Sequence, residues 1–295
     1  MPRAADALPA SCSGPVPLAG TAGVTAGLDT LERTPPSPHR PHPLRSCLPI
    51  LSTLALVLIV WQLAHALGWF PRLPSPADVG DRLARAWTDA VLPASAGYSA
   101  ARCLAGFMVS AALGIPLGLL LARVRTVRTL CGPALSSVQS LPAAALVPMV
   151  VIPMGESEAA VYAVLLLGAV PSVAVGVLHA VDQVPRQLLR AGRSMGATGP
   201  TGAVLVVLPA ALPGLLAALR QGWTFGWRAL MTAELITRTP LPGIGRMLQA
   251  GKESGDLAAV VAAVLIVLTI GVLIEAVIFA PLERRIRRNR GMTTG

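Results

Sequence analysis

Two arginines lie inside a long apolar run, where a charged side chain needs a partner or a ligand. Arg220 and Arg228 both fall within residues 203–236, and Glu234 lies near the far end of the same run. A guanidinium group can pair with two oxygens at once, so either arginine could bind a small anion. Charged groups in such runs generally face a watery cavity or the interior of a helix bundle. We therefore predict that these residues border a path that carries an anion.

The neighbours of Arg220 strengthen this prediction and also offer a simpler interpretation. Trp223, Thr224 and Trp227 follow Arg220 at spacings of three and four residues, which places all four on one helical face. Alternatively, Arg220 pairs with Glu275, with Glu234 or with the carbonyls of a kinked helix, and the tryptophans pack between helices. The six candidate path residues are Arg220, Trp223, Thr224, Trp227, Arg228 and Glu234.

A second group of residues is suited to docking on another protein. On a helix that turns about 100° per residue, Arg186, Arg190 and Arg193 fall on one stripe. The opposite side carries Leu188, Ala191, Gly192 and Met195. Pro185 precedes this segment, and Gly196 can supply the turn that ends it. The alternative is an ordinary basic loop that sets membrane topology or lies on the membrane surface.

The spacing around this loop resembles the EAA loop of permease subunits in ABC importers. That motif is written Glu-Ala-Ala, three residues, Gly, nine residues, Ile, one residue and Leu-Pro. The chain keeps the register with Ala191, Gly196, Val206 and Leu208-Pro209, but Arg190 replaces the Glu and Gly192 the second Ala. The segment from Leu208-Pro-Ala-Ala-Leu-Pro-Gly214 to Ala233-Glu234 resembles the nitrate/sulfonate/taurine branch, and the resemblance covers residues 70–288.

The resemblance implies a division of labour between this chain and its partners. The loop over residues 182–209 would dock on a separate ATPase, which would hold ATP and Mg²⁺. A solute-binding protein would act outside, and a second permease copy or a homologue would complete the path. The implied fold is that of a type I ABC importer permease, and the implied cargo is a small anion such as an aliphatic sulfonate, taurine or nitrate. The coupling residues would be Arg186, Arg190, Ala191, Gly192, Arg193, Gly196 and Pro209.

Motifs for independent chemistry are absent from the sequence. No G-x-x-x-x-G-K-[ST] loop exists, because Arg246 stands where the first glycine before Gly251-Lys252 would be. Four cysteines show no C-x-x-C spacing, and no metal-ligand cluster or nucleophile elbow occurs. We therefore expect no enzyme activity, cofactor or metal in this chain. Three alternatives stay open: an ABC permease for a thiamine precursor or other small nutrient, an ion-coupled secondary transporter, and a membrane scaffold without transport.

The composition places these residues in a lipid bilayer. Of 295 residues, 54% are hydrophobic and 13% are charged, whereas about a quarter of a soluble domain is charged. The net charge of +10 does not indicate nucleic acid, because the arginines cluster at the ends of apolar runs. Gly114 and Gly118, four residues apart, favour close approach of two helices.

We predict an all-α membrane protein with about six transmembrane helices and both termini in the cytoplasm of a bacterial cell. Lys and Arg crowd every second loop, which gives this orientation. Residues 1–45 would be a disordered tail, 46–283 the permease domain and 284–295 a basic tail, and a short helix from Pro76 would lie in the outer interface. The predicted spans are 47–69, 95–121, 130–152 (interrupted by prolines), 159–180, 203–236 (kinked near Pro209 and Pro213) and 257–281.

Overall fold

The computed structural model describes residues 43–289 of the chain. The chain divides into two units, Met1–Ile50 with Thr294–Gly295, and Leu51–Thr293. The second unit contains the helix bundle, over its described residues 51–289. The predicted tail over residues 1–45 falls almost entirely outside the described residues. The predicted basic tail is described only to Asn289, and up to that residue it continues a helix.

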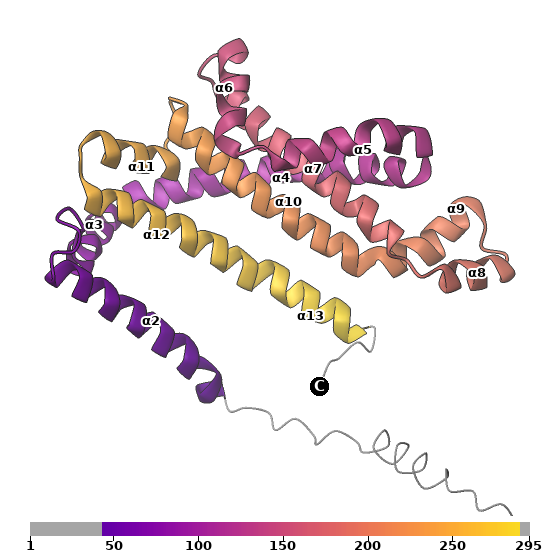
Figure 1. Cartoon of the computed structure of the whole chain (residues 1–295), viewed down its shortest axis with the longest axis horizontal. Coiled ribbons are helices and arrows are strands. Elements are labelled where there is room, and N and C mark those ends of the chain that lie inside the picture. The colour runs from indigo at the N-terminus through magenta and orange to yellow at the C-terminus, as the bar shows by residue number, and fades with distance from the viewer. Residues whose placement is uncertain (1–42, 290–295) are drawn as a thin grey trace, which may run out of the picture. The chain divides into compact units, whose positions relative to one another are not determined.

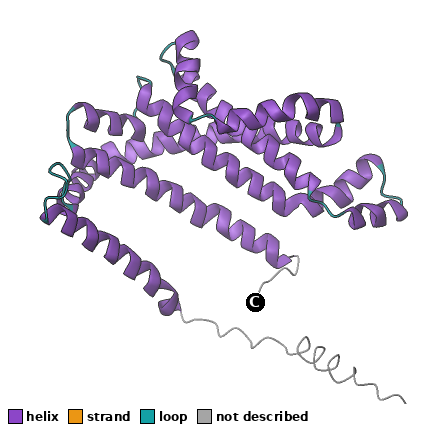
Figure 2. Ribbon diagram, in the orientation of Figure 1, coloured by secondary structure: helices purple, strands orange, loops and turns teal. Residues whose placement is uncertain are grey.

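All regular structure in the described part is helical, as predicted (Figure 2). In chain order, the elements are α2 (Pro43–Ala66), α3 (Pro76–Thr88), α4 (Val91–Arg123), α5 (Arg125–Ser140), α6 (Ala143–Met154), α7 (Glu158–Asp182), α8 (Arg186–Ser194), α9 (Gly199–Gly202), the π-helical turn η1 (Ala203–Val207), α10 (Leu208–Ile236), α11 (Ile244–Glu253), α12 (Leu257–Ile274), the π-helical turn η2 (Glu275–Phe279) and α13 (Ala280–Asn289).

Helix α7 is the centre of the bundle, and small residues bring α4 and α10 against it (Figure 1). Three glycines of α4 each meet a side chain of α7 that lies 59 positions further along the sequence, so the two helices run parallel. The contacts are Gly106 with Leu165, Gly114 with Val173 and Gly118 with Val177. On the other side of α7, the contacts with α10 run in opposite order, so these two helices are antiparallel. They are Gly168 with Ala229, Gly176 with Ala218 and Gly214 with Ala180. The predicted close approach at Gly114 and Gly118 is confirmed.

The parallel course of α4 and α7 constrains the segment between them. Four helical segments are long and apolar enough to cross a membrane, over Val91–Arg123, Glu158–Asp182, Ala203–Ile236 and Leu257–Ile286. If the pair α5 and α6 counts as one broken crossing, there are five, and Leu51–Ala66 of α2 is a shorter apolar helix. Two parallel spans need a return crossing between them, which favours this count for α5 and α6.

The third predicted span is interrupted at Pro142, where α5 and α6 meet at a bend of 105°. Pro142 lacks an N–H and disfavours helical geometry at the residue before it. Leu141 accordingly adopts ψ 134°, and Pro142 itself adopts ψ 136°. The predicted interruption by proline is thus a sharp bend between two separate helices.

Both π-helical turns lie just before a proline. The N–H of Leu208 bonds to the carbonyl of Ala203, five residues back, and Ala280 bonds in the same way to Glu275. Pro209 and Pro281 follow immediately, and a proline ring clashes with the carbonyl four residues before it. Widening the turn relieves that clash, so the predicted distortion near Pro209 takes the form of a π-turn.

The short helix predicted from Pro76 is confirmed as α3. Ser75 and Asp78 form a reciprocal capping box, in which the Ser75 hydroxyl accepts from the Asp78 N–H at 3.1 Å. The Asp78 carboxylate accepts from the Ser75 N–H at 3.0 Å. These hydrogen bonds lower the pKa of the Asp78 carboxyl group. The stabilisation from the capping box is therefore fully present above the ordinary carboxyl pKa, and it is lost as the pH falls through the lowered pKa.

Candidate functional site

The predicted coupling loop folds as a helical elbow at one end of the bundle. Helix α8 covers Arg186–Ser194, and Gly196 follows it with φ +83°. The Ala197 N–H bonds to the Gly192 carbonyl and the Gly196 N–H to that of Arg193, at 2.9 and 3.0 Å. This pattern is a Schellman cap, so the prediction that Gly196 ends the helix is confirmed.

Two motif positions meet in space across the elbow. Gly192 is buried, and a Cβ atom on it would lie 2.8 Å from Cγ2 of Val206 in η1. A larger residue at position 192 would require the Val206 side chain or α8 to shift. The motif spacing therefore corresponds to a packing contact between the small position on α8 and the aliphatic position on η1.

The rest of α8 is accessible, including its apolar side. Met195 is 86% exposed and Leu188 is 48% exposed. Ala191, the three predicted arginines and Pro209 are exposed as well. Within the described residues, none of these arginines forms an ion pair with a carboxylate. Such a surface, basic on one stripe and apolar on the other, is suited to contact with a partner protein.

Helix α10 presents a polar stripe from its middle. Its exposed residues between 217 and 228 are Ala217, Arg220, Gln221, Thr224 and Arg228. The exposed faces of α4 and α12 at comparable positions are instead apolar, with Leu104, Met108 and Leu113 on α4, and Val264, Leu268 and Val272 on α12. The exposed polar stripe of α10 thus differs from the exposed faces of α4 and α12.

The predicted single face of α10 is split in the structure. Trp223 and Trp227 are buried in the core, where their rings stack at 6.4 Å and Phe107 packs edge-on against Trp223. Arg220 and Thr224 lie on the exposed stripe. Trp223 contacts Phe107 of α4, and Trp227 lies close to Gly271 of α12, so the packing interpretation describes their placement.

The two arginines of α10 differ in their partners. Arg220 forms ion pairs with Glu275 in η2 and, at 3.3 Å, with Glu283 in α13. The internal pairing that the sequence left open is therefore present at Arg220. The Arg228 guanidinium lies 4.9 Å from the centre of the Phe225 ring, and its Nε donates to the Thr224 carbonyl at 3.4 Å. No carboxylate of the described residues pairs with Arg228.

The register between α7 and α10 gives the depth of both arginines. Arg228 lies between Gly226 and Ala229, which contact Ala169 and Gly168 near the middle of α7. Arg220 lies between Ala218 and Gly222, at a level roughly 11 Å from the α8 end of α7 at 1.5 Å per residue. Arg228 is thus the deeper of the two.

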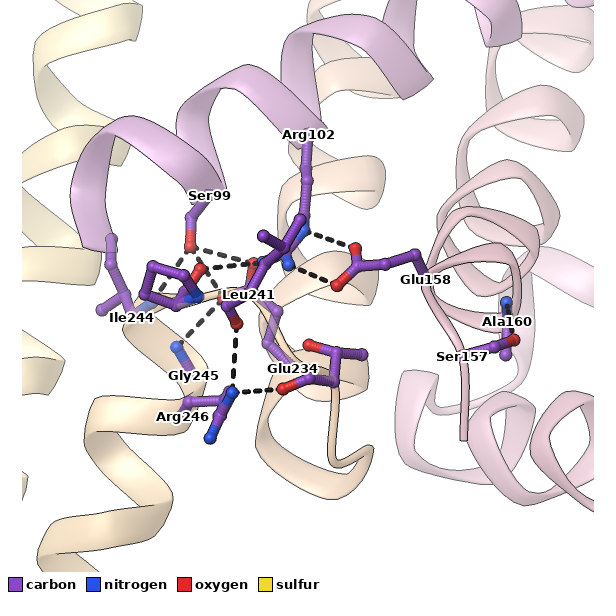
Figure 3. A network of polar contacts seen from close by, with 12 residues as sticks. Ser99, Arg102, Ser157, Glu158, Ala160, Glu234, Leu241, Ile244, Gly245 and Arg246 are labelled. Carbon is purple, nitrogen blue, oxygen red and sulfur yellow. Dashed lines mark hydrogen bonds and ion pairs between the residues drawn. The ribbon is translucent and has the colours of Figure 1, made fainter. Parts of the chain in front are cut away.

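Glu234 belongs to a buried ion network at the opposite end of the bundle from α8 (Figure 3). Arg102 of α4 is 4% exposed and Glu234 is 1% exposed. The Arg102 guanidinium donates to Glu234 at 2.9 Å and to both carboxylate oxygens of Glu158 at 2.6 and 2.8 Å. Ser99 donates its hydroxyl to Glu234 at 2.7 Å. With these hydrogen bonds, the charges of Arg102 and Glu234 can be held in the interior, whereas the Glu158 side chain is 27% exposed.

Glu234 and Ser99 also accept hydrogen bonds from the first turn of α11. The Gly245 N–H donates to Glu234 at 3.1 Å, and the Ile244 N–H donates to the Ser99 hydroxyl at 3.0 Å. An anion at a helix N-terminus is stabilised by the helix dipole. Cβ atoms on Gly243 and Gly245 would lie 2.6 and 2.5 Å from Glu234 atoms, so glycine is needed at both positions. The network thus ties α4, α7, α10 and α11 together.

Sequence reasoning missed Arg102, Ser99 and Glu158 as members of this network. Arg102 stands inside the predicted span 95–121, and an arginine within an apolar run was a signal of the kind already used for Arg220. Nothing local identifies its partners, since Glu234 lies 132 residues away.

Taken together, the fold and the site define a multi-pass, all-helical membrane protein with a basic elbow and a polar face on a central helix. The sequence profile of the binding-protein-dependent transport system inner membrane component family matches residues 114–288. The chain belongs to this family.

Three relatives carry a substrate in their names. The taurine transport system permease protein TauC of Escherichia coli K12 is 31% identical over 243 residues, 80% of this chain and 87% of its own length. The putative aliphatic sulfonates transport permease protein SsuC of the same organism is 28% identical over 74% of this chain and 83% of its own. The bicarbonate transport system permease protein CmpB of Synechococcus elongatus is 26% identical over 82% and 90%.

The fold has a solved counterpart. A chain from an inward-facing conformation of the MetNI methionine ABC transporter is similar with a TM-score of 0.56 at 23% identity. The match covers 66% of this chain and 96% of that one. At this identity, the likeness establishes the type I ABC importer permease fold.

Proposed function

We propose that this chain is the permease subunit of an ATP-driven importer that moves a small anion into a bacterial cell by alternating access. Two copies form the path at their interface, and six crossings place both termini in the cytoplasm. A separate ATPase binds ATP and Mg²⁺ and docks on α8, and a solute-binding protein delivers the cargo from outside. The chain itself binds no nucleotide.

The observation that carries this proposal is the polar stripe of α10. An arginine without a carboxylate partner at mid-membrane depth is costly against lipid and generally faces a watery cavity or another protein. The faces of α4 and α12 are apolar and suit lipid, whereas the face with Arg228 does not. This face is therefore assigned to the path between two copies.

Arg228 is the better anion contact of the two arginines. Arg220 is already neutralised by Glu275 and Glu283, whereas the positive charge of Arg228 has only a ring and a carbonyl oxygen beside it. Because a guanidinium binds oxyanions in bidentate fashion, a sulfonate, nitrate or carboxylate group fits this position. The names of the relatives point to taurine or another aliphatic sulfonate first, with bicarbonate next.

Vesicle uptake of labelled taurine tests the proposal. The full chain is reconstituted with its ATPase and its solute-binding protein, and uptake is measured with and without ATP. We expect ATP-dependent uptake, and we expect Arg228→Gln to lower it about tenfold or more, corresponding to one lost charge-assisted contact. Arg238→Gln is the matched control, because Arg238 lies just beyond α10, is exposed and pairs with Glu253 at 3.5 Å.

The outcomes separate the parts of the proposal. Uptake by the chain alone, without ATP, would show a secondary carrier. ATP-dependent uptake that Arg228→Gln leaves unchanged would remove Arg228 from the path. Uptake of a non-anionic nutrient, such as a thiamine precursor, in place of taurine would overturn the assignment of the cargo.

A further inference from the structure

A cavity of about 600 Å³ lies beneath the coupling elbow, away from the polar stripe of α10. Its walls come from the end of α4, the end of α7, one side of α8 and the junction of η1 with α10. Most of the lining is aliphatic, including Leu120, Leu189, Val204 and Leu215. The volume is in the range of cavities that bind small organic ligands.

The charged groups of this cavity are all of one sign. Arg123 from α4 and Arg193 from α8 line it, and the described residues around it include no carboxylate. Both arginines are exposed, and neither forms an ion pair with a described residue. An apolar hollow with two free cations is complementary to a molecule with a hydrocarbon tail and an anionic head.

The location of the cavity in the fold indicates which anionic molecule can reach it. The cavity is lined in part by α8, which lies at the same end of the bundle as the start of α5 (Figure 1). Arg125 and Arg128 belong to the start of α5, and Arg186 begins α8. Basic pockets between helices on the cytoplasmic side of a membrane bind the head groups of anionic lipids. The inner leaflet supplies such lipids at the same level as the cavity.

We propose that this cavity binds an anionic phospholipid, with an acyl chain against the aliphatic walls and the phosphate between Arg123 and Arg193. Because Leu189 and Arg193 belong to α8, the bound lipid contacts the elbow directly. The position of the elbow therefore depends on the lipid composition of the membrane. This site is separate from the transport path and does not depend on the identity of the cargo.

Photolabelling tests the site on the unaltered protein. The intact chain, with whatever subunits copurify, is mixed with phosphatidylglycerol that carries a diazirine in its acyl chain, and with phosphatidylcholine labelled in the same way. We expect phosphatidylglycerol to label peptides from 116–123 and 203–215, and phosphatidylcholine to label them several-fold less. Arg123→Gln with Arg193→Gln should lower the labelling by phosphatidylglycerol about tenfold or more.

Two neighbouring arginines serve as matched controls. Arg125→Gln with Arg186→Gln removes the same charge from the same end of the bundle, but neither residue lines the cavity. Labelling at these peptides should stay near the wild-type value. Equal labelling by the two lipids, an equal loss in both double variants, or peptides from elsewhere because another subunit covers the cavity would each overturn the proposal. The comparison of the two lipids needs no variant, so it stands even where a substitution impairs folding.

Discussion

At the level of single residues, Arg102 is the central side chain of the buried ion network. It satisfies two carboxylates and also donates to the Pro242 carbonyl at 3.1 Å. Its removal would leave Glu234 charged and buried with only Ser99 and Gly245 as donors. Removing one partner of a buried pair costs more than the pair itself contributes, because the remaining charge stays desolvated.

We therefore predict that Arg102→Met destabilises the protein by about 3–5 kcal/mol. The measurement is the apparent melting temperature of the purified chain in detergent. Arg82→Gln, which breaks an exposed pair with Asp256, should cost about 1 kcal/mol or less. The double variant Arg102→Met with Glu234→Gln should lose less than the sum of its parts. Equal shifts for Arg102→Met and Arg82→Gln would contradict the assignment of a buried network.

The sequence identified the individual charges of interest better than their partners. Arg220, Arg228 and Glu234 stand out because each interrupts an apolar run, and the structure gives the three quite different surroundings. Periodicity places residues on a helical face, but it does not reveal which neighbouring helix covers that face. For this reason the sequence grouped Trp223 with Arg220, whereas packing against other helices separates them.

At the level of elements, contacts between small residues set the distance from α7 to α10. A Cβ atom on Gly176 would lie 2.6 Å from the Ala218 Cβ and 2.9 Å from its Cα. The second contact is with backbone, so a side chain cannot move aside and the helices must separate. Close packing of this kind replaces the hydrophobic effect between helices in lipid.

Two substitutions that each add one methyl group should therefore have opposite effects. Gly176→Ala should destabilise the chain by about 1–3 kcal/mol through overpacking. Gly132→Ala should stabilise it by about 0.5–1 kcal/mol, because a Cβ there meets nothing within 4 Å and alanine favours a helix. Thermal unfolding in detergent measures both. A stabilising Gly176→Ala would show that α7 and α10 lie further apart than described.

The elements themselves were largely predictable, and their irregularities were not. Apolar runs and caps predict α3, α4, α7, α10 and α12 within a few residues. The sequence located an interruption at Pro142 but not the size of the bend, because proline is compatible with either a kinked or a broken membrane helix. Which of the two occurs depends on whether neighbouring helices supply partners for the freed carbonyls.

At the level of the whole molecule, the bundle has two chemically different ends. Helix α8 and the start of α5 lie at one end, with an excess of arginine, whereas α3 and α11 lie at the other, with mixed charge (Figure 1). The excess of positive charge identifies the cytoplasmic side in membrane proteins. The α8 end should therefore face the cytoplasm.

Cysteine labelling in right-side-out vesicles measures this orientation. In a background without the four native cysteines, Ser254→Cys after α11 should react with an impermeant thiol reagent from outside. Met195→Cys after α8 should react only once the vesicles are opened. Both positions are exposed, so a lack of reaction reports the side of the membrane. The reverse pattern would place α8 outside and exclude its coupling to an ATPase.

The buried ion network at Arg102 and the π-turns before Pro209 and Pro281 together affect how the helices can move. The Arg102 network joins four helices at one end of the bundle, and two chain segments contain π-helical turns toward the other. We expect a force applied at the end with the π-turns to displace the helices more there than at the end with the Arg102 network. We therefore expect the subunit to be stiffer at the end with the Arg102 network than at the end with α8.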